Sequence, residues 1–312
     1  MREIVSQRKN AYAVVASNQD RLDLLLEVVD AQREIFRRKL LVHGALLFRG
    51  FAVESAADFE IFARAFAGRE LFNYAGGVSP RRALGGAGVY TSTEYPPDVG
   101  LSLHNELSYA DTYPEQIFFG CLTAPTEGGE TTIGDSRRIL RRLDPQIVEI
   151  FKDRKIRYIR NFAGDPNSEY SWPAAFETED RRAAERVCAR IGADFAWQPD
   201  GRLQLSQTRP ATVVHPATGE EVWFNQADGF HPSNLGLENY EAIDESEFRL
   251  NCTFGDGAPI PLAALAHVRD ALRREAVPHV WQKGDVLVLD NLLAAHGRRP
   301  FSGARKIAVA MA

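Results

Sequence analysis

The sequence contains little cysteine, with only Cys121, Cys188 and Cys252 among its 312 residues. They are far apart, odd in number and form no C-x-x-C pair, which argues against a zinc knuckle, a redox dithiol or a disulfide framework. No apolar run approaches the roughly 20 residues that a membrane-spanning helix needs. The first residues also lack the apolar core and cleavage site of a signal peptide. We therefore expect a soluble, cytoplasmic protein.

The chain also lacks an excess of positive charge. Its formal net charge is -5, and no long basic run is interleaved with aromatic residues, so neither nucleic acid nor a membrane is an expected partner. A G-x-G-x-x-G motif after a strand is absent as well, because Gly85-Gly86-Ala87-Gly88 has another spacing and follows a loop. This disfavours a doubly wound nucleotide-binding fold.

The hydrophobic content of 45% is enough for one large core. We predict a single domain over residues 1–312, with a helical N-terminal part (about 1–70) and a helical and loop insertion (about 136–192). Helices are predicted over residues 19–41, 56–66, 136–143, 145–152, 178–191 and 262–275. Asn18 and Ser55 are the expected N-caps of the first two.

Short strand-like segments separated by turn signals make up most of the remaining pattern. They cover residues 45–51, 100–104, 116–122, 131–134, 155–162, 195–198, 202–207, 212–215, 221–225, 285–290, 294–296 and 306–311. Such strands, with helices at the start and in insertions, favour an antiparallel double sheet over a βαβ array. The predicted fold is mainly β with helices: a double-stranded β-helix, or jelly roll, flanked by helices.

The first candidate for chemistry is His104-Asn105-Glu106, at the end of a predicted strand. Side chains two residues apart on a strand point the same way, so His104 and Glu106 can share one side. An imidazole and a carboxylate, joined by a second imidazole, form the triad that leaves positions open on Fe(II). With 7 histidines and 42 acidic residues, about one H-x-[D/E] arises by chance. By itself, the motif is explained equally well as a surface turn.

Two residues near the end of the chain extend this pattern. His296 follows the apolar segment 285–290 and a turn, although by itself a buried core histidine is the better explanation. Arg305 begins an apolar strand and can point inward, where its guanidinium would bind the far carboxylate of a dicarboxylate. Arg298 and Arg299 are instead predicted to lie in a solvated turn.

Taken in order, these residues resemble the taurine dioxygenase family of Fe(II)/2-oxoglutarate-dependent oxygenases. Residues 103–109 are similar to the metal motif of that family, residues 125–131 to its P-x-x-G-G-[D/E]-T motif, and residues 296–305 to its closing His…Arg motif. Residues 73–77, 90–96 and 223–226 are most similar to a subgroup that includes the syringomycin-biosynthesis hydroxylase. The resemblance covers about residues 70–312.

The resemblance implies an enzyme that uses Fe(II), 2-oxoglutarate and O₂. The implied metal ligands, which are also the catalytic residues, are His104, Glu106 and His296. Thr131 would hydrogen-bond the 2-oxoglutarate carboxylate near the metal, and Arg305 would pair with the distal carboxylate. Because halogenating relatives lack the metal-binding carboxylate, Glu106 favours hydroxylation. Val309 stands where several members carry a second arginine for an acidic substrate, so an anion is not expected at that position.

The implied substrate is a small molecule: an amino acid or a derivative, free or tethered to a carrier protein, in specialised metabolism. The candidate substrate-binding residues are Tyr90, Ser92, Thr93, Glu94 and Asn225, although Asn225 could equally cap backbone groups. Desaturation or cyclisation with the same cofactors stays open, as does a homo-oligomer. Two rivals from other classes are a non-catalytic jelly-roll binding protein and a zinc hydrolase, neither of which needs Thr131 and Arg305.

Overall fold

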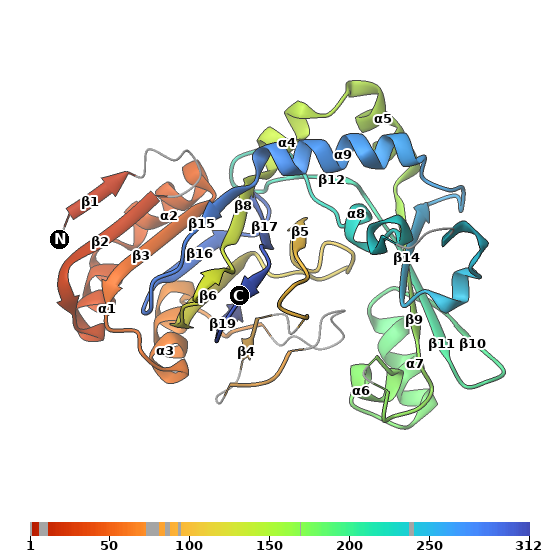
Figure 1. The fold of residues 1–312 in the computed structure, drawn as a ribbon, viewed down its shortest axis with the longest axis horizontal. Helices are drawn as coiled ribbons and strands as arrows, with labels where there is room; N and C mark the ends of the chain where they lie inside the picture. The colour runs from red at the N-terminus through yellow and green to blue at the C-terminus, as the bar shows by residue number, and fades with distance from the viewer. Residues whose placement is uncertain are drawn as a thin grey trace.

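The computed structural model describes residues 2–5, 12–72, 81–84, 88–92, 95–168, 170–236 and 240–312. Its largest element is a seven-stranded sheet (Figure 1). In spatial order its strands are β1 (Arg2–Val5), β2 (Tyr12–Asp20), β3 (Ala45–Phe51), β16 (Val286–Asp290), β6 (Gln116–Thr123), β19 (Lys306–Met311) and β4 (Val89–Thr91). Only the β2–β3 pair of this sheet is parallel. The sheet therefore joins both ends of the described chain.

A second, four-stranded antiparallel sheet faces the first. Its order is β15 (Val277–His279), β8 (Thr131–Asp135), β17 (Ala294–Arg298) and β5 (Leu101–His104). Successive side chains of a strand point to opposite faces. On β16, Leu287 and Leu289 thus pack toward the second sheet, while Val286 and Val288 pack toward the N-terminal helices. Covering on both faces explains why residues 286–289 of β16 are all apolar and buried.

Three helices cover the outer face of the seven-stranded sheet: α1 (Leu22–Ala31), α2 (Arg33–His43) and α3 (Ala56–Ala67). The predicted single helix over residues 19–41 is wrong, because Gln32 separates two helices and Asn18 lies in β2, not at an N-cap. For α3 the prediction is confirmed. Ser55 and Asp58 cap each other's backbone N–H groups reciprocally.

The middle of the chain forms a separate set of elements, on the side of the molecule away from the N-terminal strands (Figure 1). A four-stranded antiparallel sheet contains β10 (Asp194–Trp197), β11 (Leu203–Arg209), β9 (Ile156–Phe162) and β14 (Leu250–Phe254). Beside it lie α6 (Trp172–Phe176), α7 (Arg181–Arg190) and α8 (Ala227–Phe230). Against β8 lie α4 (Ser136–Arg142) and α9 (Leu262–Glu275), and α9 also contacts β5. The hairpin β12 (Thr212–Val214)–β13 (Glu221–Trp223) packs on α4, and α5 (Pro145–Arg154) follows α4 in the chain.

The fold is thus a mixed α/β one with mostly antiparallel sheets. Every predicted strand from residue 45 onward appears within a few residues of its expected bounds, and α9 begins and ends where predicted. The pattern did not predict β1, β2, β4, β14, β15, α6 or α8. Among the described residues, no helix combines the length and apolar character needed to span a membrane.

Candidate metal and co-substrate site

His104, Glu106 and His296 come together between the two facing sheets. Antiparallel pairing of β17 with β5 sets His296 directly opposite His104, with 4.4 Å between the ring centroids. Glu106 lies in the turn after β5, so strand alternation alone does not explain its direction. One ligand atom from each residue lies within 4.8 Å of the others. This is the spacing that a single bound metal ion requires.

The charges of these groups suit a divalent cation. Burial, and then the nearby His296, lower the pKa of His104 to about 4, so its ring is neutral at neutral pH. Its Nδ1–H donates to the Ser102 carbonyl at 2.9 Å, which leaves Nε2 as the atom that can bind a metal. Burial opposes ionisation of Glu106, but Arg81, followed by His296, outweighs it and lowers the pKa of Glu106 well below its ordinary range.

His296 carries an observation of its own. Its Nε2 lies 3.6 Å from Glu106 Oε2, and its Nδ1 is buried with no hydrogen-bond partner among the described groups. A buried polar atom without a partner costs free energy. The neutral His104 ring, the ionised Glu106 carboxylate and the His296 Nε2 that lies beside this carboxylate together fit a site that can bind a metal.

The turn that carries Glu106 is held from outside by side-chain amides. Leu107 adopts a left-handed conformation (φ 55°), which a residue with a Cβ rarely does without support. The fully buried Asn291 side chain donates to the Glu106 carbonyl at 2.9 Å and to the Pro114 carbonyl at 2.8 Å, and it accepts from the Glu106 N–H at 2.8 Å. Gln226 adds a fourth bond, to the Asn105 carbonyl at 2.8 Å. These amides fix the backbone on which the carboxylate stands.

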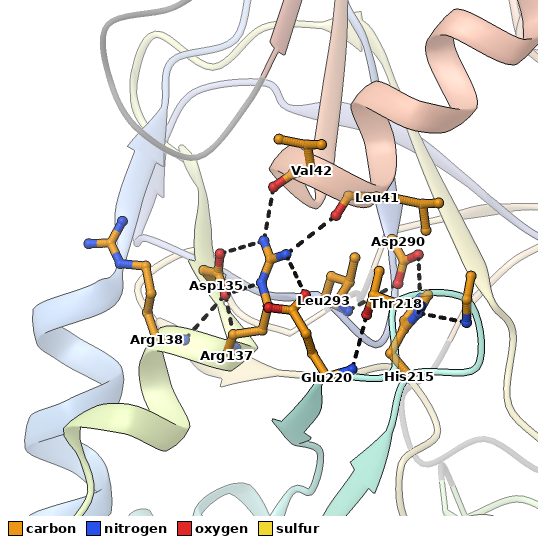
Figure 2. Close-up of polar contacts among 11 residues, drawn as sticks. Leu41, Val42, Asp135, Arg137, Arg138, His215, Thr218, Glu220, Asp290 and Leu293 are labelled. Carbon is orange, nitrogen blue, oxygen red and sulfur yellow. Dashed lines mark hydrogen bonds and ion pairs between the residues drawn. The ribbon is translucent and has the colours of Figure 1, made fainter.

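Asn291 is itself placed by a buried pair, shown in Figure 2. Asp290 accepts from the Leu293 N–H at 3.0 Å and lies 3.0 Å from Nε2 of His215. Because His215 Nδ1 accepts from the Thr218 N–H, the ring proton is on Nε2 and is donated to Asp290. The turn between β16 and β17 is therefore tied to the β12–β13 hairpin.

A second cluster in Figure 2 ties the N-terminal helices to the same region. The Arg137 guanidinium forms an ion pair with Asp135 at 2.8 Å and a second one with Glu220 at 3.0 Å. It also donates to the carbonyls of Leu41 and Val42, at the end of α2. The sheet that carries His296 is thus joined to α2 through Asp135 of β8.

A small cavity beside the histidines contains the two predicted co-substrate residues, Thr131 and Arg305. The Arg305 guanidinium donates to the Gly129 carbonyl and to Ser92 Oγ, both at 3.1 Å. Burial, and then the charge of Arg298, lower its pKa to about 10. Arg305 has no acidic partner within the described part of the chain. A desolvated cation of this kind fits an anionic ligand such as a dicarboxylate.

Comparisons with known proteins agree with this geometry. Residues 8–311 match the model of the "Taurine catabolism dioxygenase TauD, TfdA family". This chain belongs to the TauD family. It is an Fe(II)- and 2-oxoglutarate-dependent dioxygenase, as the resemblance predicted.

Among relatives of this TauD-family enzyme is the dapdiamide synthesis protein DdaC of Enterobacter agglomerans, 39% identical over 86% of this chain and 82% of its own. A clavaminate synthase-like protein of Arabidopsis thaliana is 33% identical over 92% of this chain and 86% of its own. The fold matches the crystal structure of PvcB from Pseudomonas aeruginosa with a TM-score of 0.57 at 15% identity, over 99% of this chain and 89% of that one. These similarities establish the family and leave the syringomycin-type subgroup a prediction.

Two arginines of the TauD-family site were not anticipated. Arg298 was predicted to lie in a solvated turn, which is wrong: it is buried in β17 and donates to the carbonyls of Tyr95, Pro96 and Val99. Arg81 lies against Glu106, with 2.8 Å between Nη2 and Oε2, and its side chain is 4% exposed. Arg81 stands beside another arginine in a glycine- and proline-rich stretch, so no sequence periodicity marks it.

The predicted substrate residues have varied surroundings. Ser92 accepts from Arg305, so it contacts the residue predicted to bind the co-substrate, while Tyr90 lies in β4 opposite Val309. Thr93 and Glu94 lie outside the described residues. Asn225 donates to the Ala211 carbonyl at 2.9 Å and accepts from the Ala227 N–H at 3.1 Å. These two bonds give Asn225 the backbone-capping role that was the alternative to substrate binding.

Proposed function

We propose that this TauD-family enzyme hydroxylates an unactivated C–H group of an amino acid or an amino-acid-derived molecule, free or carrier-tethered, in specialised metabolism. The name of the Enterobacter agglomerans relative, a dapdiamide synthesis protein, supports a biosynthetic role. The resemblance to the subgroup of the syringomycin hydroxylase supports the same class of substrate.

The observation that carries the proposal is a cluster of three residues that could hold a metal, next to a small cavity lined by its two histidines and by the buried Arg305. The iron ligands would be His104, Glu106 and His296. Thr131 and Arg305 would hold 2-oxoglutarate by its carboxylates. When bound, iron with 2-oxoglutarate and O₂ supplies the oxidising power, and the protein decides which C–H group is presented to it.

Each residue of the proposed site has a defined task. The Ser102 carbonyl keeps the His104 proton on Nδ1, so Nε2 stays available to the metal. Arg81 keeps Glu106 ionised and therefore able to bind the metal, in accordance with its lowered pKa. Glu106 also occupies the position that is vacant in halogenating relatives, which favours hydroxylation over halogenation.

The surrounding architecture is part of the same proposal. The two facing sheets would form a double-stranded β-helix core within one domain, with the N-terminal helices and the middle set of elements attached to it. Tyr90, Thr93 and Glu94 are retained as candidates to line the substrate pocket. Desaturation and cyclisation would use the same residues, whereas a silent binding protein or a zinc hydrolase would not need the pair Thr131 and Arg305.

An anaerobic titration tests the proposed site. Fe(II) and 2-oxoglutarate added to the protein should produce a weak visible charge-transfer band, which His296→Ala should abolish. His267→Ala, a partly exposed histidine on α9, is the matched control and should keep the band. A screen for succinate release over free and carrier-tethered amino acids then identifies the substrate. If no band forms and no succinate appears, the proposal is wrong.

A further inference from the structure

The hydroxyl of Thr131 is contacted by the indole ring of Trp281. The Nε1–H of Trp281 donates to Thr131 Oγ1 at 3.2 Å, and both residues are buried. Thr131 begins β8 and pairs with His279, the last residue of β15, and Trp281 follows two residues later. Because Thr131 also lines the small cavity that contains Arg305, this hydrogen bond belongs to the wall of the co-substrate site.

The chemistry of the two groups fixes the direction of this hydrogen bond. An indole N–H can only donate, whereas a threonine hydroxyl can both accept and donate. Thr131 Oγ1 therefore accepts from Trp281, and the proton of its own hydroxyl is directed away from the indole. An ionised carboxylate can only accept. The bond from Trp281 thus leaves the Thr131 hydroxyl as the kind of donor that a carboxylate in this cavity needs.

Trp281 is held in turn by contacts to the backbone on both sides of it. Asp285 accepts from the Gln282 N–H at 2.9 Å, and Arg49 of β3 donates to the Val280 carbonyl at 2.9 Å. Arg49 and Asp285 also form an ion pair, with 2.6 Å between Nη2 and Oδ2. The residues before and after Trp281 are therefore joined to one ion pair, which restrains the direction of the indole N–H.

We propose that Trp281 is a positioning residue for 2-oxoglutarate: its indole N–H holds the Thr131 hydroxyl as a hydrogen-bond donor toward the carboxylate near the metal. This inference rests on the function proposed above. Without the bond from Trp281, the hydroxyl proton would be free to rotate, and ordering it when the co-substrate binds would cost free energy. With the bond, the donor is already oriented in the free protein.

The competing explanation is that Thr131 only supplies the acceptor that a buried indole N–H needs. The bond would then stabilise the fold, and the affinity for 2-oxoglutarate would not depend on it. The two explanations differ in their coupling. If Trp281 acts through the Thr131 hydroxyl, its effect on the affinity disappears when that hydroxyl is removed, as a double-mutant cycle can measure.

The test measures the affinity of the full-length, Fe(II)-loaded enzyme for 2-oxoglutarate without O₂, from the charge-transfer band and by calorimetry. Trp281→Phe removes the N–H and keeps an aromatic ring, so the affinity should fall about 3- to 10-fold. Thr131→Val should lower the affinity by about tenfold or more, and adding Trp281→Phe to it should change the affinity by less than about twofold.

Trp172→Phe is the matched control for the loss of an indole N–H. Trp172 has the same relative exposure as Trp281, 5%, and its Nε1–H also donates at 3.2 Å, to the Gly201 carbonyl between β10 and β11. This bond lies in the middle set of elements, so the control should keep the wild-type affinity for 2-oxoglutarate.

The indole N–H signals in a ¹H–¹⁵N NMR spectrum give a second measurement, which does not require Trp281→Phe to fold. Thr131→Val removes the acceptor, so one of the four tryptophan indole signals should move upfield. In the wild-type enzyme loaded with diamagnetic Zn(II), 2-oxoglutarate should shift the same signal, because the Thr131 hydroxyl then donates to the bound carboxylate.

Three results would overturn the inference. They are wild-type affinity in Trp281→Phe, an equal loss from Trp281→Phe with and without the Thr131 hydroxyl, and an indole signal that 2-oxoglutarate does not shift. The Fe(II)–2-oxoglutarate band of the wild-type enzyme separates the two proposals. Without that band the proposed function fails, and with it any of the three results contradicts this inference alone.

Discussion

Removing the amide of Asn291 should weaken metal binding although Asn291 is not a metal ligand. Asn291→Ala deletes three hydrogen bonds and leaves the Glu106 N–H, the Glu106 carbonyl and the Pro114 carbonyl buried without that partner. At about 1 kcal/mol or more for each group, the free energy of unfolding should fall by about 3 kcal/mol. Two of the three bonds restrain Glu106 itself. The affinity for Fe(II) should therefore fall by up to about 2 kcal/mol, or roughly 30-fold.

Two measurements on the metal-free and metal-loaded protein test this reasoning. Urea unfolding gives the stability change, and an anaerobic Fe(II) titration in the presence of 2-oxoglutarate gives the affinity. Asn161→Ala is a matched control, because its amide also donates to two carbonyls, those of Glu245 and Phe248, but lies on β9. The control should lose stability and keep its Fe(II) affinity. If Asn291→Ala also keeps wild-type affinity while losing stability, the idea that Asn291 positions Glu106 is refuted.

Three further predictions follow from single contacts. Arg305→Met removes the cation proposed for the distal carboxylate, so 2-oxoglutarate should bind about 2–4 kcal/mol more weakly, or roughly 30- to 700-fold, with Fe(II) affinity unchanged in a metal titration. Gly129→Ala places a Cβ on a backbone with φ +67°, so the free energy of unfolding in urea should fall by about 1–2 kcal/mol. The new Cβ would also lie 3.1 Å from Arg305 Cδ, so the KM for 2-oxoglutarate should rise. Burial opposes ionisation of Asp285, but Arg49 and then His279 lower its pKa in the folded protein. The ionised carboxylate therefore stabilises the fold above the unfolded pKa of about 3.9, and this stabilisation is lost as the pH falls below that value. The free energy of unfolding of Asp285→Asn should consequently depend less on pH in this range than that of the wild type.

The strands were predictable where local pattern and tertiary environment agree. Helices cover one face of β6, β16 and β19, and a second sheet covers the other. These strands are therefore apolar on both sides, and their continuous apolar segments are recognisable in the sequence. The N-terminal region was not predictable in this way. Residues 12–20 pair in parallel with β3, a long-range contact, and the break at Gln32 carries no glycine or proline signal.

The convergence of His104, Glu106 and His296 could be predicted because the order and residue types of these three positions suit a metal site. The position of Arg298 was missed because the predicted strand ends at residue 296. β17 continues to Arg298, which lies two residues after His296 and therefore shares its face of the strand. Arg81 and Asn291 act through contacts to Glu106 that span 25 and 185 residues of sequence. A single sequence does not encode such contacts as a local pattern, so they needed the three-dimensional structure.

The central proposal is that His104, Glu106 and His296 hold the metal while Arg305 holds 2-oxoglutarate. Crystals grown with Mn(II) and 2-oxoglutarate test it most directly, because the anomalous signal of Mn(II) locates the metal independently of the protein atoms. The account predicts one peak bounded by Nε2 of both histidines and the Glu106 carboxylate, with the distal carboxylate of 2-oxoglutarate on Arg305. A peak elsewhere, or a co-substrate that does not reach Arg305, would contradict it.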